Sequence, residues 1–110
     1  MKSWILILGA ASVCAGCGGS IPPPNDAFAA AQADVGRAEA GGAQAVPDAR
    51  LHVQLALEDL QKSRQLMGVD NRRAQSLCAL ASAEAQLAIS LAKEAHAEED
   101  ARRSEAALHR

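Results

Sequence analysis

Cys14 and Cys17 stand at a Cys-x-x-Cys spacing, which a redox dithiol, half of a zinc site and a haem attachment point all use. Each of these sites needs further residues. A redox site has a surrounding βαβ pattern, a structural zinc has about four Cys or His ligands, and an attached haem has His directly after the second Cys. Gly18 takes that last position here, and Cys78 is the only cysteine further along the chain. The spacing alone therefore does not predict a reactive site.

The residues around this pair are typical of a secretory signal. Lys2 supplies a positive charge, residues 4–13 form a short apolar run, and the small residues Ala15 and Gly16 follow it. The run has only about half the ~20 residues that a membrane-spanning helix requires. We therefore predict a signal peptide over residues 1–16. An ordinary secreted protein cut nearby and a cytoplasmic dithiol protein are the alternatives.

Residues 14–17, Cys-Ala-Gly-Cys, resemble the Leu-Ala-Gly-Cys type of box in bacterial lipoprotein precursors, with Cys14 in the place that Leu usually holds. The resemblance implies that Cys17 is the lipidation site: its sulfur receives a diacylglyceryl group, signal peptidase II cuts after Gly16, and the new amino terminus is acylated. Two or three acyl chains anchor a protein far more firmly than one. The membrane, reached through this lipid anchor, is thus an expected partner.

Gly18 follows the lipidated cysteine, where an Asp favours retention in the inner membrane of Gram-negative bacteria. The resemblance therefore implies the periplasmic face of the outer membrane. Residues 17–25 are predicted to form a lipidated tether, and residues 26–110 an alanine-rich helical domain.

The mature chain keeps all 13 acidic residues and loses one of the 11 basic ones, so its formal charge is 10 − 13 = −3. This balance argues against a nucleic acid as partner, because proteins that bind one carry a basic stripe.

Alanine is the commonest residue of the chain and the strongest helix former, whereas only 2% of the residues are aromatic. No segment of the mature chain alternates as a strand does. We predict an all-α fold of three helices packed as in a coiled coil: an antiparallel alanine-rich helical hairpin with a shorter N-terminal helix. Because large side chains are few, the helices must approach closely or pair with another chain.

Start and stop signals divide the domain into helices over about residues 26–40, 47–67 and 72–109. The signals are an Asn25-Asp26 cap, Pro47 in a first turn and a cap at Asp70 or Asn71, with stops at Gly41-Gly42 and Gly68. The turn around Gly68 is so short that the last two helices must lie antiparallel. At about 1.5 Å per residue the last helix is ~57 Å long and extends beyond its partners.

The spacing of apolar residues assigns faces to these helices. The first has one stripe, made of Phe28, Ala31, Val35 and Ala38. The second has two faces, which predicts that it lies in the middle; they are Leu51, Leu55 and Leu66 against Val53, Leu57, Leu60 and Met67. The last has a leucine stripe that we expect to face the core and to end near residue 95, made of Leu77, Leu80, Leu87, Leu91 and Ala95.

Several polar residues leave alternatives open. Glu84 interrupts the leucine stripe, either as a buried functional acid, or because the core-facing stripe is shifted, or as a residue with a partner such as a nearby Arg. Cys78 is either a small core residue or the site of an intermolecular disulfide. The acidic run over residues 94–100, which includes a histidine, is either solvated or collects a divalent ion. The tail is also spaced for ion pairs from Glu98 and Glu99 to Arg102 and Arg103.

The two long helices resemble the alanine-rich hairpin of domain-of-unknown-function family 4398, with the resemblance extending over about residues 26–100. It rests on Leu55, Leu60 and Gly68 before the turn and on Ala74, Leu77, Ala81, Ala85, Ala88 and Ala92 after it. Members of that family are small periplasmic lipoproteins or lie beside peptidoglycan-binding domains. The resemblance implies a bacterial envelope lipoprotein.

The three histidines are scattered, and the sequence has neither a helical zinc pair nor a nucleophile-elbow serine. We therefore predict no enzyme, no catalytic residue, no metal and no cofactor. The expected function is that of an outer-membrane-anchored periplasmic lipoprotein with a structural or interaction role, as a helical spacer or adaptor in the cell envelope. Its last helix would bind an envelope protein or a second copy. The alternative is a ligand-handling module whose helices part to admit a lipid or a glycan.

Overall fold

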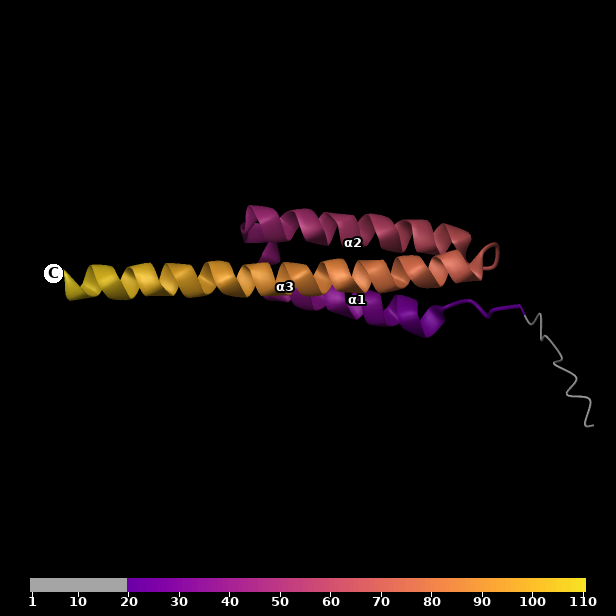
Figure 1. Cartoon of the computed structure of the whole chain (residues 1–110), viewed down its shortest axis with the longest axis horizontal. Coiled ribbons are helices and arrows are strands. Elements are labelled where there is room, and N and C mark those ends of the chain that lie inside the picture. Colours follow the sequence, from indigo (N-terminus) through magenta and orange to yellow (C-terminus); the bar gives the residue numbers. More distant parts are fainter. Residues whose placement is uncertain (1–19) are drawn as a thin grey trace, which may run out of the picture.

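The computed structural model describes residues 20–110. Three α-helices make up the domain: α1 (Asn25–Ala40), α2 (Pro47–Leu66) and α3 (Asn71–Leu108), with a short 3₁₀-helix, η1 (Ala43–Ala45), between the first two. α2 and α3 form an antiparallel hairpin, and α3 extends well beyond both other helices (Figure 1). Residues 20–110 contain no strand. The all-α prediction, with a short first helix and a long last one, is confirmed, and each helix agrees with its expected bounds within one residue.

Local signals explain where the helices begin and end. Gly42 and Gly68 have φ angles of 84° and 82°, a left-handed conformation that glycine adopts without steric penalty. Pro47 stands at the start of α2, where its missing N–H has no helical partner to lose. Asp70 caps α3, because its side chain accepts a hydrogen bond from the Arg73 N–H at 3.0 Å.

The start of α1 differs from the expected cap. Asn25 is already helical, Pro24 takes the N-cap position, and no side chain among the described residues caps this end. The Phe28 N–H instead donates to the Pro24 carbonyl oxygen at 2.9 Å. The prediction of an Asn25-Asp26 cap is therefore wrong, because the fixed φ of proline already suits the entry into the helix one residue earlier.

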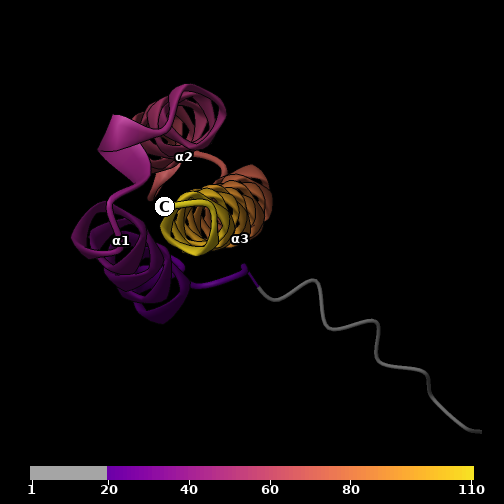
Figure 2. The same cartoon turned by 90° about the vertical axis from the view of Figure 1, so that its left-hand side faces the viewer.

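α3 is the helix that packs along both others, whereas α1 and α2 contact each other much less. Viewed end-on, the three helices form a triangle (Figure 2). Two contacts mark the flanks of α3: Glu84 meets His52 of α2, while Ser82, about 200° round the helix, donates to Asp34 of α1. The prediction that the second helix lies in the middle is therefore wrong.

The core is built mainly from alanine. Along α3 the buried positions alternate steps of four and three residues, as in a coiled coil, and such small side chains let helix axes come close. We call these positions of α3 the alanine seam: Ala74, Cys78, Ala81, Ala85, Ala88 and Ala92. The other helices add Ala31, Val35 and Ala38 from α1, and Ala49, Val53, Ala56 and Leu60 from α2, with Phe28 packed against them. The stripe predicted for the first helix is thus confirmed.

The leucine stripe predicted to face the core lies beside the alanine seam instead. Leu80 and Leu87 are 48% and 44% exposed, and Leu77 and Leu91 are half-buried. Spacings of three and four residues fit two adjacent stripes of one helix. The smaller side chains take the inner stripe here, because a closer approach of the helices gives more contact along their length. The prediction of a leucine-lined core is wrong, although the core does end close to residue 95.

Cys78 belongs to the core. It is 1% exposed and free, and its sulfur lies 3.0 Å from the Ser63 hydroxyl oxygen. Ser63 is itself buried and donates to the Ala74 carbonyl oxygen at 2.8 Å, so that its hydroxyl is satisfied inside the hairpin. Of the two roles left open for Cys78, the structure supports the core residue, because a second chain does not reach a buried thiol.

The last turns of α3 lie outside the core. We call residues 97–108 the overhang; Glu99 is half-buried there and all the others are exposed. A helix that is polar all round gains little from packing, which supplies most helical stability in proteins. Within residues 20–110, no helix has an apolar stretch long enough to cross a membrane.

The alanine seam predicts a reversal of the usual effect of side-chain size. Ala85→Leu inserts a large side chain between closely spaced helices and should destabilise the fold by about 1–3 kcal/mol. Leu80→Ala removes a larger side chain but from an exposed position, so it should change stability by less than about 1 kcal/mol. Urea unfolding followed by circular dichroism measures both values. Equal losses in the two variants would contradict the assignment of the seam to the core.

The overhang should contribute little to the stability of the isolated protein. Deletion of residues 99–110 is expected to leave the melting temperature nearly unchanged, because no core contact is lost. Amides beyond Glu98 should exchange with solvent much faster than amides around Ala81, as measured by hydrogen exchange and mass spectrometry. Equal protection of the two regions would show that the overhang packs on its own chain.

Candidate functional site

The predicted lipidation site, Cys17, lies outside the described residues, as does Cys14. The described residues begin three positions after Cys17. These first residues lie at the end of the bundle that carries the α2–α3 turn (Figure 1). The Asn71 side-chain amide donates to the Ile21 carbonyl oxygen at 2.7 Å. The same side chain accepts from the Gly68 N–H at 2.7 Å. Asn71 therefore joins the tether to the turn, a role that the sequence analysis missed when it considered this residue only as a helix cap.

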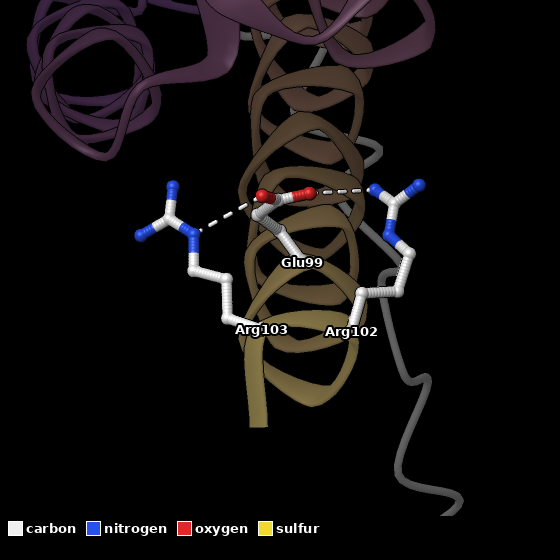
Figure 3. A network of polar contacts seen from close by, with 3 residues as sticks. All are labelled: Glu99, Arg102 and Arg103. Carbon is white, nitrogen blue, oxygen red and sulfur yellow. Dashed lines mark hydrogen bonds and ion pairs between the residues drawn. The ribbon is translucent and has the colours of Figure 1, made fainter. Parts of the chain in front are cut away.

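The overhang forms the opposite end of the molecule. There Glu99 accepts from Arg102 at 2.8 Å and from Arg103 at 3.1 Å (Figure 3). These spacings of three and four residues are the predicted ones, although Glu98 takes no part in an ion pair within residues 20–110. Such exposed pairs along a helix contribute only about 0.3–0.5 kcal/mol each. Because they are exposed and weak, these ion pairs do not build a rigid site on the overhang.

The acidic run over residues 94–100 does not assemble a metal site. Within the described part of the chain, no three His, Cys, Asp or Glu side chains come close enough to hold one ion. His96 turns towards the end of α1 instead, where its Nε2 lies 3.2 Å from the Gly41 carbonyl oxygen. The carboxylate of Glu99 is taken up by arginines. Of the two alternatives for this run, the structure supports the solvated one.

A polar cluster lies between α2 and α3, at the middle of the hairpin. His52 Nδ1 and Glu84 Oε2 are 2.5 Å apart, and both side chains are about three-quarters buried, with 24% and 22% exposed. Glu84 thus has a partner, and the inward-facing stripe is shifted beside it, as two of the three alternatives proposed; the partner is a histidine 32 residues away rather than an arginine. Only the register of the hairpin brings the two together, so no local pattern predicted the pair.

Asp59 lies near this pair and was also missed. It is buried on α2, facing the same side of the hairpin as Glu84. Burial raises the pKa of the Asp59 carboxyl above its ordinary value of 3.8; the Lys62 ammonium opposes this rise, while the charges of Glu84 and Glu58 add to it. Two carboxyl groups and an imidazole therefore share one stretch of the α2–α3 surface.

Leucines flank this cluster on the side of the hairpin that α1 leaves uncovered. Residues three, four and seven positions from Glu84 share its stripe of α3, and α2 adds two leucines beside His52. We call this surface the leucine face: Leu51 and Leu55 from α2, and Leu77, Leu80, Leu87 and Leu91 from α3. Leu51, Leu80 and Leu87 are each about half exposed. On α2 the exposed Glu58 and Lys62 follow these leucines on the same stripe, so charged residues interrupt the leucine face there.

A groove lies on the other side of α2, beside the beginning of α1. The Arg64 guanidinium stands 5.1 Å from the centre of the Phe28 ring, an arrangement that favours a cation over an aromatic face. Leu57, Leu60 and Gln61 complete the walls of this groove.

Comparison of the chain with protein-family models, with curated proteins and with solved structures found no match.

The raised pKa of Asp59 predicts a pH-dependent effect of its removal. An ionised Asp59 opposes folding, because the folded protein holds the proton more tightly than the unfolded chain does. Asp59→Asn should therefore be at least as stable as the wild type at neutral pH. This advantage should shrink as the pH falls from neutral through the raised pKa towards 3.8, where both states become protonated. Urea unfolding at a series of pH values measures it.

Asp100→Asn serves as the control, because Asp100 is exposed on the overhang and its removal should leave the pH profile unchanged. A loss of stability in Asp59→Asn at neutral pH would contradict the prediction. It would mean that the attraction between Asp59 and Lys62 outweighs the penalty of burial.

Proposed function

We propose that this chain is an outer-membrane lipoprotein, anchored through Cys17 on the periplasmic face, whose helical domain acts as a spacer or adaptor in the cell envelope. The resemblance of the hairpin to domain-of-unknown-function family 4398 agrees with this proposal. Binding, rather than catalysis, is the activity proposed for the domain.

The difference between the two ends of the molecule is the observation that carries the proposal. Ile21 is held against Asn71 at the α2–α3 turn, and the overhang lies at the far end of α3 (Figure 1). Cys17 precedes Ile21 by four residues, which span at most about 14 Å. A lipid on Cys17 would thus hold the turn close to the bilayer.

The length of α3 sets the reach of such an anchored domain. Its 38 residues extend over ~57 Å, directed away from the turn. The exposed overhang would then be presented in the periplasm, at a distance from the membrane that a rigid helix keeps constant. An anchored chain with a free, charged helical end suits contact with another envelope component better than it suits chemistry.

Lipidation is tested by substituting each of the two cysteines. Cys17→Ser should abolish labelling by a palmitate analogue and leave uncut precursor, because the proposed acceptor sulfur is gone. Cys14→Ser is the matched control and should leave labelling intact. Labelling measured by gel fluorescence, together with membrane fractionation, gives the result. Labelling that depends on Cys14 rather than Cys17 would overturn the proposed anchor.

A further inference from the structure

We propose that the turn end of the α2–α3 hairpin is a membrane-docking surface, which binds the headgroups of anionic phospholipids and directs α3 away from the bilayer. We call this surface the tip; its members are Ile21, Arg64, Val69, Arg72 and Arg73. The inference deepens the proposed function and rests on it, because a lipid on Cys17 brings the tip to the bilayer. It adds a contact between the folded domain and the membrane surface.

The distribution of charge along the bundle is the first argument. Residues 20–26 and 62–73, which make up the turn end, carry four basic and two acidic residues, a net charge of 4 − 2 = +2. The basic residues are Lys62, Arg64, Arg72 and Arg73, and the acidic ones are Asp26 and Asp70. The other described residues carry six basic and eleven acidic ones, or 6 − 11 = −5. An anionic surface therefore attracts this end of the molecule and repels the remainder.

The direction of the arginine side chains is the second argument. Side chains of a helix lean towards its N-terminus, and α3 begins at the turn. The exposed side chains of Arg72 and Arg73 therefore lean out towards the end of the bundle. Within residues 20–110 neither forms an ion pair, so both guanidinium groups can bind phosphate.

The nearest carboxylate does not cancel these charges. Asp70 Oδ1 accepts from the backbone N–H of Arg73, so this carboxylate is directed onto the start of α3 as its cap. On the α2 side Arg64 supplies a third guanidinium, which stands 5.1 Å from the centre of the Phe28 ring. Basic groups of both helices thus surround the turn.

Val69 is the third argument, because it places an apolar side chain at the very end of the hairpin. It is 82% exposed in the turn and lines a hollow together with Ile21 and Arg72. A single exposed apolar residue is common on protein surfaces. An apolar side chain between arginines, however, suits the boundary of a bilayer, where it meets the acyl chains while the guanidinium groups stay among the phosphates.

The tether explains why such a small surface is enough. Asn71 holds Ile21 against the turn, and only four residues separate Ile21 from Cys17. A lipid on Cys17 thus keeps the tip facing the headgroups at a high effective concentration, at which a few weak contacts suffice. The overhang lies at the opposite end (Figure 1), so docking of the tip would point it away from the membrane.

The test measures how close the tip lies to the bilayer when the purified full-length lipoprotein is reconstituted in vesicles. A fluorophore is attached at Gln65→Cys, an exposed uncharged position near the turn, in a Cys78→Ala background that keeps the alanine seam small. Lipids with nitroxide headgroups quench this fluorophore when the tip touches the surface. Quenching should be strong in phosphatidylcholine vesicles that contain phosphatidylglycerol and weak in phosphatidylcholine alone, and added salt should reduce it.

Two matched pairs of substitutions locate the contact. Arg72→Gln with Arg73→Gln should lower the ratio of quenched to unquenched fluorophore at least about tenfold in the anionic vesicles, because two headgroup contacts are lost. Arg102→Gln with Arg103→Gln changes an equally adjacent and exposed pair of α3 and should leave the ratio unchanged. Circular dichroism checks that each variant is folded, and Arg72→Gln alone takes the place of the first pair if that pair lowers the melting temperature.

Three results would overturn the inference. The first is equal quenching in the two kinds of vesicle, and the second is quenching that survives the substitutions at Arg72 and Arg73 in folded protein. The third is equal quenching of a fluorophore at Ser104→Cys on the overhang, which would mean that α3 lies flat on the bilayer.

Mass spectrometry of the purified protein separates this inference from the proposed function. If Cys17 carries no lipid, the proposed anchor is wrong, and flotation of the same chain with the two kinds of vesicle tests the tip by itself. Flotation only with phosphatidylglycerol, lost in Arg72→Gln with Arg73→Gln, would support the tip, and any other pattern would exclude it. If Cys17 is lipidated but quenching does not depend on these arginines, the anchor stands and the tip is excluded.

Discussion

The close approach of alanine-lined helices along α3 is the constraint on which the remaining structure depends. Alanine contributes little apolar area, so contact must come from the helix backbones and from the length over which they run together. Steps of four and three residues keep the small side chains in line over five turns of α3. The antiparallel hairpin, the position of α1 and the place of the buried Ser63 and Cys78 all follow from that seam.

A core of small side chains also decides what the surface offers. In a leucine-lined bundle the large residues lie inside and the outer surface is polar. Here Leu80 and Leu87 of α3 and Leu51 of α2 stay about half exposed, whereas Val53 and Leu60 of α2 are buried in the core. The fold thus reaches its compact arrangement without fully burying any leucine of α3.

The two ends of the bundle differ for equally simple reasons. At one end Asn71 binds both the Gly68 N–H of the turn and the Ile21 carbonyl oxygen, which joins the beginning of the domain to the hairpin. At the other end α3 continues after its partners have stopped, and only its own ion pairs support it. One end of the bundle is thus joined to the start of the domain and the other projects beyond the core, and among the described residues no three His, Cys, Asp or Glu side chains assemble a metal site.

The sequence by itself determined the helices, their order and their ends, because alanine, proline, glycine and Asp70 act on the backbone within a few residues. It also determined the stripe of α1 and the limit of the core near residue 95, since both follow from the period of one helix. It did not determine which of two adjacent stripes of α3 turns inwards, because alanines and leucines both recur at steps of three and four. Only the packed structure decided that α3 is the helix that contacts both others and that His52 meets Glu84, because these depend on how closely the helices approach and on the register of residues more than thirty positions apart.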